Sequence, residues 1–132
     1  MAPLTSMQIA ESFLYNFYES TLTDLPCLNQ LFVSDATIQF STPISEKKQY
    51  KVTNFDDISV GMSQFLLKYC KKIDVLQWSQ QCVGDGIVIK SIVQYKDIRD
   101  DVVVLTSESF YLIQLPIQGA YAVKGYICQL MK

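Results

Sequence analysis

The sequence predicts an α+β domain in which helices pack on one face of a curved antiparallel sheet. Apolar residues recur at helical spacing in the N-terminal part of the chain, and at alternate positions from Ile73 onward. The 132 residues are enough for one domain with its own core, so we expect a single domain over residues 1–132. Because 49% of the residues are hydrophobic and only 18% are charged, the composition excludes a disordered chain.

The first helix is expected to begin at Thr5 or Ser6, either of which can cap it, and to end near Thr21. Its apolar residues recur four positions apart, in adjacent pairs, and form one broad stripe: Ile9, Ala10, Phe13, Leu14, Phe17 and Tyr18. This stripe is the face that we expect to pack against the sheet.

A short second helix and a brief strand are expected next. Asp24 followed by Pro26 is typical of a helix start. The helix carries three apolar residues, namely Leu28, Leu31 and Phe32. The strand is expected over residues 36–40, where Ile38 and Phe40 share a face.

A surface loop and a third helix complete the first half of the predicted domain. Residues 41–54 are polar and contain Pro43, which favours a loop. Asp56 or Asp57 can cap a helix that ends near Cys70. Its inward residues are expected to be Ile58, Met62, Phe65, Leu66 and Tyr69.

Four strands in a meander are expected over residues 73–82, 87–95, 102–115 and 120–131. The first turn contains Gly84 and Gly86, which can adopt positive φ. The second turn is the charged segment 96–101, and the third is 116–119.

Two of these strands carry apolar residues on both faces. Ile87 and Ile89 point one way while Val88 and Ile92 point the other, and the pattern recurs in residues 110–115. A sheet with one face in water alternates apolar with polar residues. We therefore expect another subunit to cover the outer face; the alternative is a monomer with a few exposed apolar residues.

Several classes of function are excluded or disfavoured by composition. Histidine is absent, which removes histidine-based catalysis and histidine metal sites. The four cysteines, Cys27, Cys70, Cys82 and Cys128, form no C-x-x-C pair and are interpreted as small buried hydrophobes. The net charge of −2 argues against direct nucleic-acid binding. No metal or cofactor is expected.

The chain shows no targeting or membrane signal. Nothing before Met7 is typical of a secretory signal, and the longest apolar runs, such as residues 102–105, are far too short to span a bilayer. We expect a soluble protein with reduced thiols, located in the cytoplasm and the nucleus.

Four stretches resemble the nuclear transport factor 2-like family, whose fold is a cone of helices on a curved sheet. They are Ala10–Tyr18, Leu28–Ile38, Gly61–Leu66, and Ser109–Pro116 with Tyr121-Ala-Val123. Each motif is unspecific by itself, but their order and spacing match over nearly the whole chain. The resemblance implies the cone-like fold with three N-terminal helices.

The enzyme branch of that family places an aspartate base after its first strand, where this chain has Phe40. Tyr15 lies near the position of that branch's oxyanion donor, and the dehydratase branch needs a histidine. The resemblance therefore implies a protein that is not an enzyme. An isomerase-type cavity lined by Asp35, Tyr69 and Tyr95 is the less favoured alternative.

The protein-binding branch dimerises through the outer sheet face and binds Phe-Gly peptides beside its first two helices. The resemblance places the dimer face on Tyr111, Ile113 and Val123. It places the peptide groove on Ile9, Phe13, Leu31 and Cys128, residues that are equally well interpreted as core. Residues 125–129 lack the family's Asn-Asp pair, which leaves both a homodimer and a heterodimer open.

Nuclear transport factor 2 engages Ran-GDP partly through carboxylates near one turn, which here holds Asp97, Asp100 and Asp101. A solvated, charged turn is the simpler interpretation. The resemblance favours a dimeric domain in nucleocytoplasmic transport, binding Phe-Gly nucleoporins, Ran-GDP or an mRNA-export partner subunit, with nuclear pores as an implied location. The alternative is a scaffold domain of the stress-granule Ras-GAP-binding or deubiquitinase-cofactor type.

Overall fold

One helix and six strands build the structure, a computed structural model that describes residues 5–23, 28, 30–41, 47–51, 71–99, 101–116 and 120–131. The elements are α1 (Ser6–Thr23), β1 (Phe32–Ser41), β2 (Lys47–Lys51), β3 (Lys72–Val83), β4 (Gly86–Lys96), β5 (Val102–Gln114) and β6 (Tyr121–Leu130). They form the predicted α+β arrangement of helix on a curved, mostly antiparallel sheet, but the described residues contain one α-helix, so the expected count of three is not confirmed.

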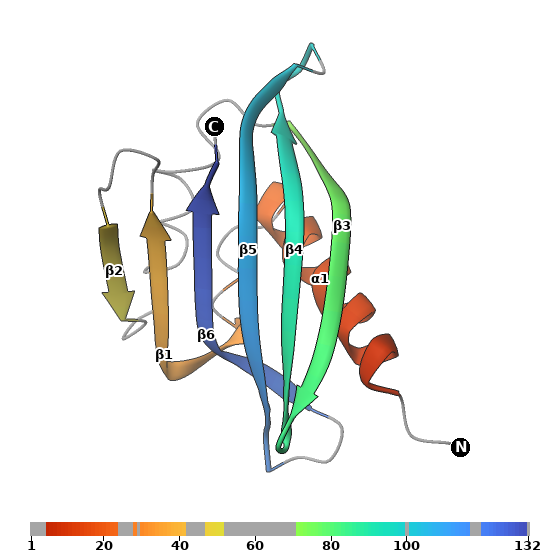
Figure 1. Ribbon diagram of the computed structural model, residues 1–132, viewed down its shortest axis with the longest axis vertical. Coiled ribbons are helices and arrows are strands. Elements are labelled where there is room, and N and C mark those ends of the chain that lie inside the picture. Colours follow the sequence, from red (N-terminus) through yellow and green to blue (C-terminus); the bar gives the residue numbers. More distant parts are fainter. Residues whose placement is uncertain are drawn as a thin grey trace.

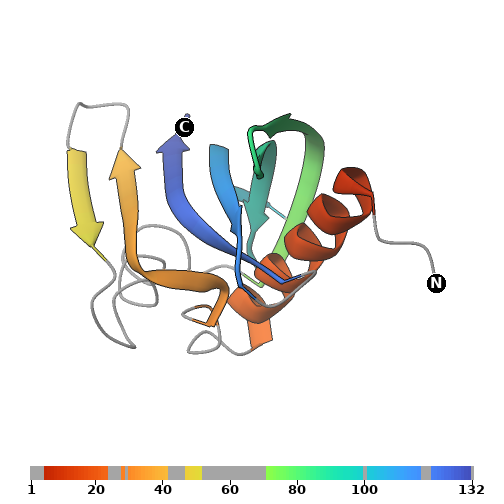
Figure 2. The same cartoon turned by 90° about the horizontal axis from the view of Figure 1, so that it is seen from below.

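The six strands lie in the order β2-β1-β6-β5-β4-β3 (Figure 1). β3 to β6 form the predicted antiparallel meander, while β1 runs parallel to β6. Figure 2 shows the sheet curving around α1, which lies against its concave side near β3 and β4. The concave side is called the inner face below, and the opposite side the outer face.

Helix α1 begins with a capping box. The side chain of Thr5 accepts a hydrogen bond from the Gln8 backbone N–H at 3.1 Å, and the Gln8 side chain accepts one from the Thr5 N–H at 2.9 Å. The predicted cap at Thr5 is therefore confirmed. The helix runs two residues past the predicted end, and all of the predicted stripe is buried except Ile9, which is half-buried against the core.

The core is a cluster of aromatic rings between α1 and the inner face. Phe17 is fully buried, and its ring centroid lies 4.9 Å from that of Phe110 and 5.5 Å from that of Tyr126. Phe13 meets Phe110 edge to face at 5.2 Å. Edge-to-face and tilted pairs of this kind add to the free energy already gained by burying the rings.

The predicted strands of the meander are confirmed within a few residues, and so is its first turn; the second and third turns lie partly outside the described residues. A two-residue turn, Gly84 and Asp85, joins β3 to β4, and Gly84 has a φ of +59°, which a glycine adopts without steric cost. In the turn between β4 and β5, the Asp97 carboxylate accepts hydrogen bonds from the backbone N–H groups of Arg99 and Asp101.

Three expectations for the first half of the chain need correction or lie outside the described residues. Phe32 begins β1 instead of ending a helix, although the tight helical turn around Leu28 and Leu31 lies where the second helix was predicted. Residues 47–51, predicted as loop, form β2 and pair with β1. The predicted third helix, from Asp56 or Asp57 to Cys70, lies outside the described residues.

Cys128 is buried as predicted, whereas Cys82 is exposed, so the interpretation of every cysteine as a core residue is wrong at Cys82. Cys27 and Cys70 lie outside the described residues. Within the described part of the chain, no helix combines the length and hydropathy needed to cross a membrane.

Candidate functional site

A buried polar cluster interrupts the aromatic core on the inner face, centred on Glu108 of β5. One carboxylate oxygen, Oε2, accepts hydrogen bonds from the hydroxyls of Tyr95 at 2.6 Å and Thr106 at 2.7 Å. The other, Oε1, accepts one from the Tyr126 hydroxyl at 2.6 Å. Nearby, the hydroxyl of Tyr18 lies 3.0 Å from that of Ser91. Helix α1 and three neighbouring strands thus supply the hydroxyl groups of one cluster.

Burial sets the protonation behaviour of this cluster. It raises the pKa of Glu108 above its ordinary value of 4.5, although the hydrogen bonds from Tyr126, Tyr95 and Thr106 favour the ionised form. Burial also raises the pKa of Tyr95 and of Tyr126 well above 10.0, so both hydroxyls keep their protons and remain donors.

The Glu108 cluster is closed to solvent. Glu108 and Tyr95 have no exposed area. A carboxylate and a tyrosine hydroxyl could serve acid–base chemistry in an open cavity. Here the carboxylate and the tyrosine hydroxyl form hydrogen bonds with each other and not with a substrate, so the cluster is part of the core.

The outer face carries an open apolar hollow of about 220 Å³ across β1, β6, β5 and β4. Its apolar lining comes mainly from Val88, Tyr111 and Ile127, with Gly125 at its centre. A Cβ placed on Gly125 would meet nothing closer than 3.9 Å, so the missing side chain helps to leave the hollow open. Ile127 is 47% exposed, which is high for a residue in a central strand.

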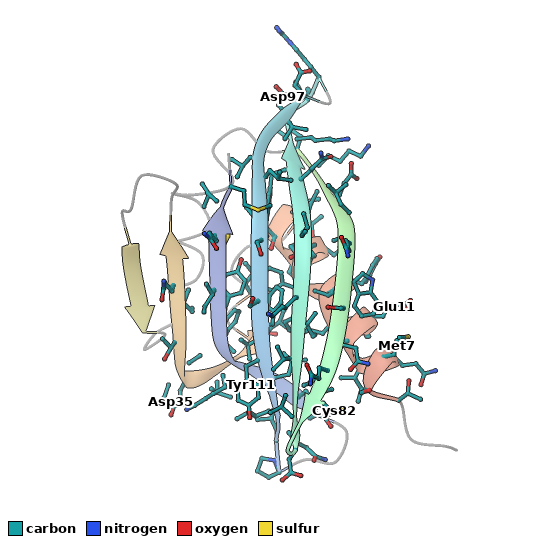
Figure 3. All side chains as sticks on the ribbon, viewed as in Figure 1. Met7, Glu11, Asp35, Cys82, Asp97 and Tyr111 are labelled. Carbon is teal, nitrogen blue, oxygen red and sulfur yellow. The ribbon has the colours of Figure 1, made fainter. Side chains whose placement is uncertain are left out.

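Tyr111 is held in place beside this hollow by a close contact with Gly86. A Cβ on Gly86 would lie 2.6 Å from Tyr111 Cε1 and 2.7 Å from the backbone oxygen of Leu112. The ring therefore packs over the start of β4, in the lower part of the sheet in Figure 3. The outer face thus presents a fixed aromatic side chain at the edge of an apolar hollow.

Two of the three residues predicted for the dimer face lie on the outer face, and their role in dimerisation stays a prediction. Tyr111 and Ile113 lie on the outer face, Tyr111 exposed and Ile113 half-buried. Val123, in contrast, is fully buried in the core, so its prediction as a dimer contact is wrong. A register shift between β5 and β6 pairs Val123 with the inward residue Leu112 and thereby places it on the inner face.

The residues of the predicted peptide groove lie in or against the core. Phe13 and Cys128 are buried in the central cluster, and Ile9 and Leu31 are half-buried against it. The groove prediction is therefore wrong at Phe13 and Cys128, which offer a peptide almost no surface, and the core interpretation of these two residues holds.

The predicted acidic contact is a well-ordered turn. Asp97 uses its carboxylate to hold the backbone of residues 99 and 101, at the tip labelled in Figure 3. Asp101 is exposed, and Asp100 lies outside the described residues. Ile98 between them is 84% exposed. The two hydrogen bonds within the turn account for the Asp97 carboxylate without a contact to a partner protein.

The isomerase-type residues that the structure describes are not gathered in one cavity. Tyr15 is 69% exposed on the outside of α1, and Asp35 forms an exposed ion pair with Lys124 at 2.5 Å. Tyr95 is buried against Glu108. Tyr69 and the side chain of Phe40 lie outside what the structure describes. It is Tyr18, not Tyr15, that α1 directs toward the buried carboxylate cluster.

Sequence reasoning missed Glu108 and, of its hydrogen-bonding partners, named only Tyr95. The signal was present in the alternation of β5: Thr106 and Glu108 stand at positions in phase with Phe110 and Leu112, which face inward. A carboxylate on the same face of a strand as core residues needs hydrogen-bond donors nearby, because an unpaired buried charge costs free energy. Tyr95 and Tyr126 are the inward aromatic residues of the neighbouring strands.

The fold defines the class of this domain: it has the nuclear transport factor 2-like fold. The sequence matches no protein-family model and no curated protein sequence. Solved structures match along the whole chain. The yeast Ubp3-associated protein Bre5 is 17% identical with a TM-score of 0.79, over 98% of each chain.

Two bacterial proteins show the same architecture. A nuclear transport factor 2-like protein from Cytophaga hutchinsonii is 12% identical with a TM-score of 0.69, over 97% of this chain and 100% of its own. A candidate calcium/calmodulin-dependent protein kinase II association domain from Xanthomonas campestris is 12% identical with a TM-score of 0.70. The match covers 99% of this chain and 93% of its own.

Proposed function

We propose that this chain is a protein-interaction domain of the scaffold type, without enzymatic activity, which dimerises through the outer face of its sheet. The observation that carries the proposal is the apolar hollow beside Tyr111 and Ile127 on that face. A sheet face open to water has no need of such residues, whereas an interface gains free energy from burying them.

The similar structures support the scaffold role over the transport role. Bre5 is named for its association with Ubp3, and the Xanthomonas protein for an association domain. Neither name refers to nucleoporins, Ran or export, so binding of Phe-Gly nucleoporins or Ran-GDP stays a prediction from sequence alone. The arrangement around Glu108 supports the absence of catalysis, because its carboxylate has no exposed area for a substrate to reach.

The test is the mass of the domain in solution, measured by light scattering over a range of concentrations. The wild type is expected to have twice the mass of one chain. Tyr111→Asp places a carboxylate in the interface and should weaken the dimer by at least a hundredfold, equivalent to roughly 3 kcal/mol.

Ile98→Asp is the matched control, since Ile98 is exposed at a hairpin tip far from the hollow. This control should remain a dimer. A wild type that is monomeric at every concentration, or a Tyr111→Asp variant that is as dimeric as the control, contradicts the proposed interface.

A further inference from the structure

A groove of about 280 Å³ separates the exposed flank of α1 from β3, away from the outer-face hollow. Leu14 and Tyr18 of α1 contribute buried apolar surface to it, and Ile73 and Trp78 of β3 are half-buried. Figure 3 shows the N-terminal half of α1, with Glu11, beyond the β3 edge of the sheet. The groove is therefore accessible and mainly apolar.

The α1 rim of this groove is acidic. Glu11 and Glu19 both line it and both are exposed, with Tyr15 between them. Helix α1 contains no Lys or Arg, and no basic side chain lines the groove among the described residues. The two carboxylates thus give an apolar groove a negative rim, which is complementary to a basic segment.

The opposite wall of the groove is an edge strand. β3 is last in the order of the sheet, so one side of its backbone faces no further strand of that sheet. An edge strand can pair with an extended peptide, which gains main-chain hydrogen bonds along the strand. A register shift interrupts β3 between Val75 and Gln77, which limits such pairing to short segments.

We infer that this groove binds a short extended segment of a partner protein, with an apolar side chain between two basic ones. The inference rests on the proposed interaction function and names the partner's chemistry. Glu11 and Glu19 are eight helical residues apart, which corresponds to about 12 Å along α1. An extended peptide covers that distance in about four residues. Basic side chains four positions apart therefore match both carboxylates, and the apolar one between them meets Tyr15 and Trp78.

The test uses a fluorescein-labelled nonapeptide of glycine and serine that carries two arginines four positions apart and a leucine midway between them. Binding to the purified domain is followed by fluorescence anisotropy at low ionic strength. Saturable binding is expected, and it should weaken as salt is added. A peptide with glutamates in place of the arginines should not bind. Absence of saturable binding by the arginine peptide, or equal binding of the two peptides, overturns the inference.

Variants locate the binding site. Glu11→Gln combined with Glu19→Gln should weaken binding roughly 2- to 30-fold, since exposed charge pairs contribute modestly. Tyr15→Ala should weaken it about tenfold. The matched control, Asp85→Asn combined with Asp101→Asn, removes two exposed charges elsewhere and should leave affinity unchanged. All of these side chains are exposed, so the variants are expected to fold, which thermal unfolding checks.

Equal affinity of the groove variants and the control overturns the inference. Light scattering on the same samples separates the two proposals, because failure of peptide binding in a protein that remains dimeric rejects the groove alone.

Discussion

The inner and outer faces of the sheet are built from alternate residues of the same strands, yet they differ in what they do. On β6, Tyr126 is 1% exposed and packs among aromatic rings, while the next residue, Ile127, is 47% exposed beside a hollow. The inner face is closed by packing and by the hydrogen bonds of Glu108. The outer face keeps apolar surface available. The comparison teaches that one backbone can close one side of a sheet into a core and leave apolar surface exposed on the other.

The largest effect is expected from breaking the inner face at Phe17. This ring is fully buried and lies close to the rings of Phe13, Tyr18 and Phe110. Phe17→Ala should lower the free energy of unfolding by about 3–5 kcal/mol, because it leaves a cavity among rings that cannot close around it. Urea unfolding measures this, and a loss below 1 kcal/mol would show that the core relaxes freely.

The second effect concerns the polar part of the inner face. Glu108→Ala leaves the hydroxyls of Tyr95, Tyr126 and Thr106 without their shared acceptor. Because each unpaired buried donor costs free energy, the loss should be about 2–4 kcal/mol. Glu108→Gln keeps an acceptor oxygen and should cost less in the same urea experiment. Equal losses in the two variants would contradict a hydrogen-bonding role.

Glu108 also gives stability a pH dependence that its Gln variant lacks. Since burial raises its pKa in the folded state above 4.5, the folded protein binds a proton more tightly than the unfolded chain. The contribution of protonated Glu108 to the free energy of unfolding is therefore fully present below about pH 4.5. It is lost as the pH rises through the raised pKa of Glu108. The difference in unfolding free energy between wild type and Glu108→Gln should shrink or reverse in favour of the variant over that range. Parallel pH curves would disprove the raised pKa.

The smallest losses of unfolding free energy are expected from substitutions of two glycines, Gly86 and Gly125, which test how open the outer face is. Gly86→Ala should cost about 1–3 kcal/mol, because its Cβ would collide with Tyr111 and with the backbone of Leu112. Gly125→Ala should change the unfolding free energy by only about 0.5 kcal/mol, since its Cβ would enter the hollow. Both are measured by urea unfolding. A cost at Gly125 as large as that at Gly86 would mean that the hollow is not open.

Local patterns were enough to predict α1 and the four strands of the meander. The stripe from Ala10 to Tyr18 has a helical period, and residues 86–114 alternate with period two, so both elements follow from nearby residues alone. The presence of apolar residues on the outer face was predicted from strands in which apolar residues occupy both sets of alternate positions.

Features that depend on distant residues could not be predicted in this way. β2 is polar and resembles a loop, and its pairing with β1 is a tertiary contact. A register shift separates Val123 from Gly125, and one extra residue in a strand reverses the faces of the side chains on one side of it relative to the other. Glu108 is identified as a core residue only once Tyr95 and Tyr126 are known to face it.

The parallel pairing of β1 with β6 has a consequence for how a newly made chain folds. Phe32 lies opposite Val123 and Ile38 opposite Tyr126, so β1 is synthesised early but joins the sheet through residues made much later. Contacts between such distant residues form slowly, because closing the loop between them costs entropy before any contact is gained. The apolar residues of β1 therefore stay unpaired with β6 until it is made, and exposed apolar residues of this kind favour aggregation in that interval.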